Sequence, residues 1–125
     1  MADFAQIQIS DLTPTTVTYS PVSLENGKSV RSDFSRGVAF PRTLTVAHST
    51  TGKGHGLLDR HLFRLTDVQE DTASESVSAQ AGSVYLVVEK PRRIVTDAHI
   101  SSMIEQIIDY FSVSANITEH LAGKP

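Results

Sequence analysis

Hydrophobic and polar residues alternate along most of the first ninety positions, which is the period of β-strands with one buried face. Near the N-terminus, apolar residues on both sides of turn-forming positions 11–15 predict a hairpin: Phe4, Ile7, Ile9, Val17 and Tyr19. The Asn-Gly pair at 26–27 predicts a second tight turn. Runs of β-branched and aromatic residues predict further strands at 29–34, 37–40, 42–49, 60–68 and 83–90.

After Pro91 the hydrophobic period changes to that of a helix. Apolar residues recur at the three- and four-residue spacing of one helix face, at Ile100, Met103, Ile104, Ile107, Ile108 and Phe111. Thr96 is placed to cap this helix, and Asp97 lies where the helix dipole favours an anion. A break near 112–114 precedes a short second helix at 115–122. There Ile117 and Leu121 are expected to face inward, and Gly123 to end the helix.

Strands first and helices last predict an α+β fold with one antiparallel sheet, in a single domain spanning residues 1–125. Residues 69–82 are polar, small and acidic, which predicts a long exposed loop before the last strand. One long helix and a short one cover a six- or seven-stranded sheet poorly. The isoleucine stripe therefore predicts a partner subunit, most simply in a homodimer.

Composition narrows the possible functions. The chain has no cysteine, which excludes disulfides, thiolate metal sites and a cysteine nucleophile. No run approaches the roughly 18 apolar residues of a membrane span, and the first residues lack signal-peptide features, so intracellular synthesis is expected. The net charge is −3, but residues 26–65 carry seven basic and two acidic side chains. Such a basic centre can present a positive face on an acidic protein.

The chemical motifs favour no catalytic residues, no metal site and no cofactor. The segment Gly52-Lys53-Gly54-His55-Gly56 lies between predicted strands, and no Ser or Thr follows its lysine, so it fails as a phosphate-binding loop. It is interpreted as a mobile hairpin connection. The five histidines lack metal-ligand spacing. Asp59 and His61 could form an acid–base pair on one strand face, which leaves a small dimeric enzyme or ligand-binding domain as an alternative.

Strand alternation also predicts a polar surface. If Phe63 and Leu65 point into the core, Arg60, Leu62, Arg64 and Thr66 lie on the opposite face of their strand. Arginines can contact phosphates, hydroxyls can donate or accept, and an aromatic ring can stack on an unpaired base. The predicted RNA-binding residues on three neighbouring strands are Thr43, Thr45, Ser49, Arg60, Arg64, Tyr85, Val87 and Glu89.

In this layout the sequence resembles the coat proteins of single-stranded RNA bacteriophages (the levivirus-like group). The segments that carry the resemblance are Gly37-Val38-Ala39, RTLTV from Arg42, DRHLFRL from Asp59 and SVYLVVE from Ser83. The resemblance extends over nearly the whole chain. It implies subunits whose helices interlock over a continuous sheet, an icosahedral virion, synthesis in a bacterial cytoplasm, and viral single-stranded RNA as the partner.

The resemblance also implies roles for individual residues. Tyr85 falls where the family often has a base-stacking aromatic residue, Thr45 among its polar strand contacts, and Arg60 and Arg64 among its basic ones. Val87 departs from the family, which commonly has a polar RNA contact there, and this departure argues against base-specific recognition. Residues 69–82 resemble the loop that gathers at the symmetry axes of the shell. Helix residues 100–111 are expected to form the dimer interface.

Overall fold

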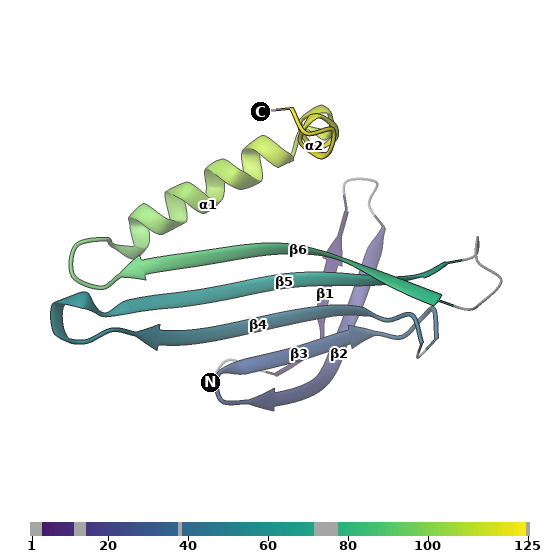
Figure 1. Ribbon diagram of the computed structural model, residues 1–125, viewed down its shortest axis with the longest axis horizontal. Coiled ribbons are helices and arrows are strands. Elements are labelled where there is room, and N and C mark those ends of the chain that lie inside the picture. Colours follow the sequence, from purple (N-terminus) through teal and green to yellow (C-terminus); the bar gives the residue numbers. More distant parts are fainter. Residues whose placement is uncertain (1–3, 12–14, 38, 72–77, 125) are drawn as a thin grey trace.

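The computed structural model describes residues 4–11, 15–37, 39–71 and 78–124. Six antiparallel strands form one sheet in chain order, and two helices follow (Figure 1). The predicted α+β arrangement is therefore confirmed. The elements are β1 (Ile7–Ser10), β2 (Thr16–Glu25), β3 (Lys28–Asp33), β4 (Arg42–Thr51), η1 (Gly54–Gly56), β5 (Leu58–Asp71), β6 (Ser78–Pro91), α1 (Asp97–Phe111) and α2 (Ser114–Leu121). Neither helix is long and apolar enough to cross a membrane.

The N-terminal hairpin and the Asn-Gly turn predicted from the sequence are present. β1 pairs with the first residues of β2, from Ile7 opposite Tyr19 to Ser10 opposite Thr16, which confirms the N-terminal hairpin. Asn26 and Gly27 both have positive φ, of 46° and 76°, as the Asn-Gly turn requires. The strand expected at 37–40 was wrong. Its described residues belong to the connection from β3 to β4, where the Gly37 amide donates to the Phe34 carbonyl over 2.9 Å.

The long loop expected at 69–82 was also wrong. β5 and β6 continue as a paired ladder to Asp71 opposite Ser78, so most of this polar stretch is strand. Only residues 72–77 between the two strands lie outside the described part. The backbone explains the discrepancy, because ladder hydrogen bonds form whatever the side chain.

α1 begins as predicted. Thr96 caps it by accepting a hydrogen bond from the His99 amide (3.3 Å), and the His99 ring accepts one from the Thr96 amide (3.1 Å). Lys90 at the end of β6 donates to Asp97 over 2.6 Å and fixes the start of the helix against the sheet. In the view of Figure 1, both helices lie beyond β6 and do not cover the sheet. Leu121 does not face inward as expected: it is 81% exposed.

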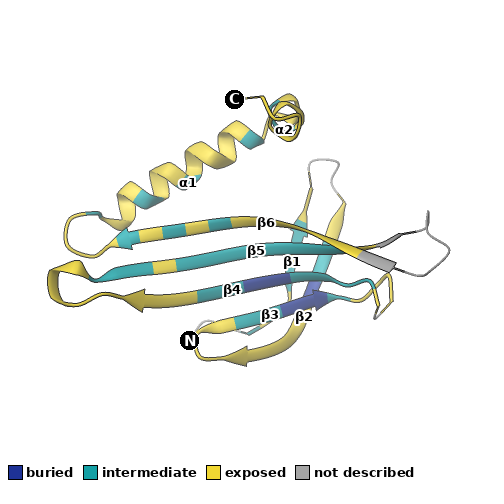
Figure 2. Ribbon diagram, viewed as in Figure 1, coloured by how far each residue is buried: buried dark blue, intermediate teal, exposed yellow. Residues whose placement is uncertain are grey.

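The sheet has two chemically different faces. The face that carries Leu44, Val46, Phe63, Leu65 and Leu86 is called the core face here, and the register places these residues in adjoining rows. The N-terminal hairpin lines hollows on this face, with Phe4 and Ile7 near Val46, and Val17 and Tyr19 near Leu65. Tyr19 and Leu44 are the buried apolar residues of the described chain (Figure 2).

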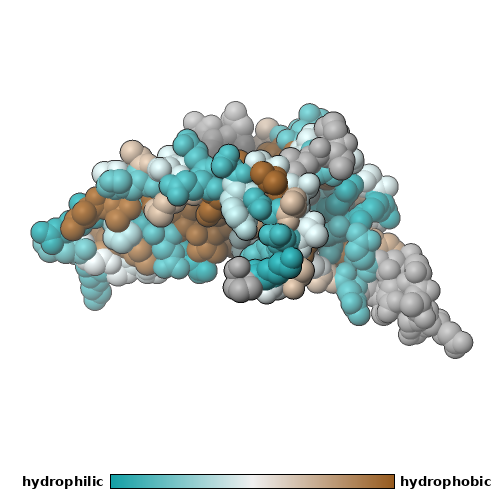
Figure 3. Space-filling model, turned by 90° about the horizontal axis from the view of Figure 1, so that it is seen from above, coloured by the Kyte–Doolittle hydropathy of each residue, from teal (hydrophilic) through white to brown (hydrophobic). Residues whose placement is uncertain are grey.

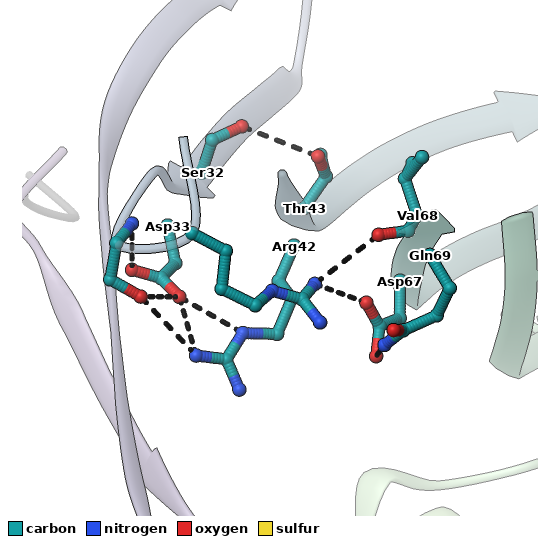
Figure 4. Close-up of polar contacts among 9 residues, drawn as sticks. Ser32, Asp33, Arg42, Thr43, Asp67, Val68 and Gln69 are labelled. Atoms are coloured by element: carbon teal, nitrogen blue, oxygen red, sulfur yellow. Dashed lines mark hydrogen bonds and ion pairs between the residues drawn. The ribbon is translucent and has the colours of Figure 1, made fainter. Parts of the chain in front are cut away.

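An ion-pair cluster fixes the end of the core face nearest the β3–β4 connection (Figure 4). Asp33 accepts from Arg42 at 2.9 Å, and Arg36 in the connection pairs with Asp67 on β5. Burial alone would raise the pKa of the Asp33 carboxyl, but the hydrogen bonds from Ser35 and Arg42 outweigh it and lower that pKa. The cluster therefore ties β3, β4 and β5 together.

Candidate nucleic-acid interface

The face opposite the core face is called the polar face here. The register aligns its side chains in rows across β3, β4, β5 and β6. Alternate residues of a strand share one face, so these rows are neighbours about 7 Å apart. The four rows are Ser32–Thr43–Thr66–Ser83, Val30–Thr45–Arg64–Tyr85, Lys28–Ala47–Leu62–Val87 and Ser49–Arg60–Glu89.

All eight residues predicted to bind RNA lie on the polar face, and they are spread over its four rows. Thr45, Arg64 and Tyr85 are direct neighbours, and so are Ser49, Arg60 and Glu89. Thr43 is one row further along and Val87 lies between the two groups. Sequence alternation therefore located this surface correctly, while its role in binding remains a prediction.

Individual side chains of the polar face differ in exposure. Tyr85 is 57% exposed, and the guanidinium carbon of Arg64 lies 5.7 Å from the centre of its ring. Thr45 is only 3% exposed. Arg64 Nε is buried and has no hydrogen-bond partner among the described residues. Arg60 is exposed opposite Glu89. The face thus offers an aromatic ring, a guanidinium held against it, and a separate exposed cation.

The second surface predicted from the sequence is the apolar stripe of α1. No residue of α1 or α2 is buried. Ile100, Met103, Ile104 and Ile107 lie beside Leu86 and Val88 at the β6 edge. Ile107 is nevertheless 45% exposed and Ile108 63% exposed, and Phe111 contacts the rings of Tyr110 and His120. Seen from the side of the helices, hydrophobic residues are open to solvent (Figure 3).

The total accessible surface is also large for the chain. It measures 9,209 Å² for a 13.6 kDa protein. A folded monomer of that mass exposes about 6,600 Å². The excess of roughly 2,600 Å² is of the size that an obligate subunit interface covers.

The alternative acid–base pair is not formed. Asp59 accepts from Arg92 at 2.9 and 3.0 Å and from Thr50 at 2.9 Å, and these bonds hold the pKa of its carboxyl at about 2. A carboxylate with so low a pKa is a poor general base near neutral pH. His61 instead shares a hydrogen bond of 2.7 Å with His48, Nδ1 to Nδ1, on the core face. Sequence reasoning missed both arrangements, because each depends on cross-strand register.

The remaining candidate features are the glycine-rich segment and a metal site, and the segment has a structural explanation. Gly52–Gly56 connects β4 to β5 through the short helix η1, as a strand connection should, and its mobility remains a prediction. Gly52 has a φ of 90°, and a Cβ there would overlap the Gly56 carbonyl oxygen. Within the described ranges no three histidine or acidic side chains converge as metal ligands.

Comparison with known proteins identifies solved structures that share this fold. No family model matches the sequence, and no curated protein matches it significantly. Solved structures match nearly the whole chain. The virus-like particle of Beihai levi-like virus 21 superposes with a TM-score of 0.78 at 12% identity, over 98% of this chain and 97% of that one.

Two further particles give the same result. The virus-like particle of bacteriophage ESE058 superposes on this chain with a TM-score of 0.75 at 16% identity, over 94% of both chains. That of bacteriophage NT-214 has a TM-score of 0.73 at 14% identity, over 99% of this chain and 98% of that one. The chain therefore has the fold of subunits that form virus-like particles of single-stranded RNA bacteriophages. The resemblance predicted from the sequence is confirmed at the level of the fold.

Proposed function

We propose that this protein is the coat protein of a single-stranded RNA bacteriophage, which assembles into a closed shell around viral RNA. The observation that carries the proposal is the match of the complete order of strands and helices to particle-forming subunits, over nearly the whole length of both chains. A structural role also suits a chain whose candidate acid–base pair is occupied by other contacts.

The assembling unit is a homodimer. The stripe of α1 (Ile100, Met103, Ile104, Ile107, Ile108 and Phe111) supplies its helical contact, and the excess exposed surface supports an interface of that size. β6 is the last strand of the sheet and has a neighbour on one side only. A 14-residue open edge is a template for pairing with another strand. Pairing of two β6 edges would join two sheets into one, with the helices crossing from each subunit to the other.

The polar face binds the RNA. It is the side of the sheet opposite the N-terminal hairpin. Its four rows carry Lys28, Arg60 and Arg64 together with the acid Glu89, and the register places a second acid, Glu25 of β2, opposite Lys28. Phosphate contacts from these cations would supply salt-dependent affinity. Tyr85 would add roughly 1–3 kcal/mol by stacking on an unpaired base. The RNA in this proposal lies inside the shell, on the surface that the two protomers present together.

RNA retention distinguishes the polar face from the Gly52–Gly56 connection. Particles of a double variant, Arg60→Ala with Arg64→Ala, should contain less RNA and lose it with a flatter salt dependence, while the dimer stays intact. The matched control replaces Lys53 and His55 with serine, which removes one cation and one imidazole from the connection. We expect this control to retain its RNA. If the control loses RNA and the arginine variant keeps it, the connection is the binding element.

A further inference from the structure

We infer that the polar face holds unpaired RNA of any sequence, because its side chains contact bases and phosphates without reading base edges. This inference rests on the proposed RNA-binding function and specifies its ligand class. Base identity is read by donors and acceptors that are fixed in position and reach a base edge. The question is therefore whether any row of the polar face supplies such groups.

The row Ser32–Thr43–Thr66–Ser83, called the hydroxyl row here, does not discriminate between bases. Its four hydroxyl groups form two cross-strand pairs, Ser32 with Thr43 at 3.3 Å and Thr66 with Ser83 at 3.1 Å, and either oxygen of each pair can donate. A hydroxyl that can rotate to donate or accept suits any base edge. This row can hydrogen-bond RNA but cannot distinguish one base from another.

The row of Tyr85 supplies stacking, which tolerates every base. Thr45 is buried between its neighbours, so its hydroxyl is not available to a base edge in this conformation. The Arg64 guanidinium lies against the Tyr85 ring, and the ring remains more than half exposed. Arg64 is thus a positioning residue that holds the ring for stacking on its open side. Every base has a π-face, so such a contact carries no sequence information.

In the third row, an apolar stretch on β4, β5 and β6 separates this stacking residue from the exposed arginine, and Lys28 ends the row on β3, opposite Glu25 of β2. Ala47, Leu62 and Val87 adjoin one another across β4, β5 and β6, and Val87 is 37% exposed. These side chains can pack against a ribose or the flat side of a base, but they offer no hydrogen bond. This stretch therefore interrupts the polar face between Tyr85 and Arg60.

The last row is suited mainly to phosphate. Arg60 is exposed and lies opposite Glu89, so the acid of this row is beside a cation. Glu89 is the single side chain here that could select a base by accepting from an exocyclic amine. The Glu89→Gln variant tests how much this side chain contributes to base preference.

The test is binding of the full-length chain, dissociated to dimers, to labelled 20-nucleotide oligo-U, oligo-A and oligo-C and to one stem-loop, by fluorescence anisotropy. We expect the dissociation constants for the three unpaired probes to agree within about threefold at one salt concentration. The stem-loop should bind through its loop alone, and Glu89→Gln should leave this ranking unchanged. A preference above about tenfold for one base would overturn the inference while leaving RNA binding in place. Failure to bind any probe would overturn the RNA-binding proposal itself and this inference with it.

Matched arginine variants test the positioning role. Arg64→Lys keeps the charge but removes the planar group that lies on Tyr85. We expect at least fivefold weaker binding with an unchanged salt slope, and the same loss in Tyr85→Ser, within the range that stacking of one base supplies. Arg60→Lys should stay within about twofold of the unaltered protein, and Tyr85→Phe should too. If Arg64→Lys binds normally, Arg64 acts by its charge alone and has no positioning role through the ring.

Discussion

Replacing Ile107 on α1 by aspartate should separate the dimer, because this residue lies at the centre of the apolar stripe. Ile107 is 45% exposed in the single chain. Full burial of such a side chain is worth roughly 1.5–3 kcal/mol, so covering its exposed half contributes about 1 kcal/mol in each protomer. The carboxylate adds an unpaired charge to an apolar contact, which costs several kcal/mol more. A total near 4 kcal/mol corresponds to roughly a thousandfold weaker dimer.

The assay is analytical ultracentrifugation of the purified variants beside unaltered dimers released from particles, with far-UV circular dichroism to confirm that each chain remains folded. Aspartate and isoleucine differ little in helix propensity, so α1 itself should persist. Ser102→Asp is the matched control, because it adds the same charge on the opposite side of α1. We expect Ile107→Asp to sediment as monomer or to aggregate, and Ser102→Asp to remain dimeric. A normal dimer of Ile107→Asp, with normal particles from it and from Ile108→Asp, would refute the helical interface.

Three further predictions concern stability and assembly. Since Arg92 and Thr50 hold the pKa of Asp59 at about 2, below the ordinary value, the stabilisation they provide is complete above about pH 4 and is lost as the pH falls toward 2. Urea unfolding between pH 5 and 2 should show this loss, and a smaller one in Asp59→Asn; equal pH dependence in both proteins would contradict the assignment. Gly52→Ala should prevent the β4–β5 turn from closing and lower the yield of folded protein. Gly54→Ala, where a Cβ meets nothing within 4 Å, should cost only about 1 kcal/mol, and similar behaviour of the two variants would count against the overlap argument. Replacing residues 72–77 by Asn-Gly should join Asp71 to Ser78 in a two-residue hairpin and leave the dimer folded, while electron microscopy shows altered or missing shells. Loss of the dimer would mean that this segment is required for folding.

The sequence predicted those features that depend on local period. Alternation placed Thr43, Arg64 and Tyr85 on one face because strand side chains repeat every two residues. The helical spacing of Ile100, Ile104 and Ile107 located the stripe, and Thr96 was recognised as the cap of α1. These features need no knowledge of which strands are neighbours.

Features that depend on register or on a partner were not predictable in this way. The pairs of Asp59 with Arg92 and of His48 with His61 require the alignment of separate strands. The extension of β5 and β6 through polar residues gives no hydrophobic signal, because the ladder hydrogen bonds come from the backbone and form whatever the side chain. Leu121 was expected to face inward because it is apolar, yet the single chain leaves it exposed.

The central claim is that this chain assembles by itself into a shell that contains RNA. The most direct test is size-exclusion chromatography with light scattering on the protein purified from bacteria that express it alone. We expect a megadalton species with strong nucleic-acid absorbance that resists added nuclease. A small species without RNA, stable across protein concentration and salt, would contradict the claim.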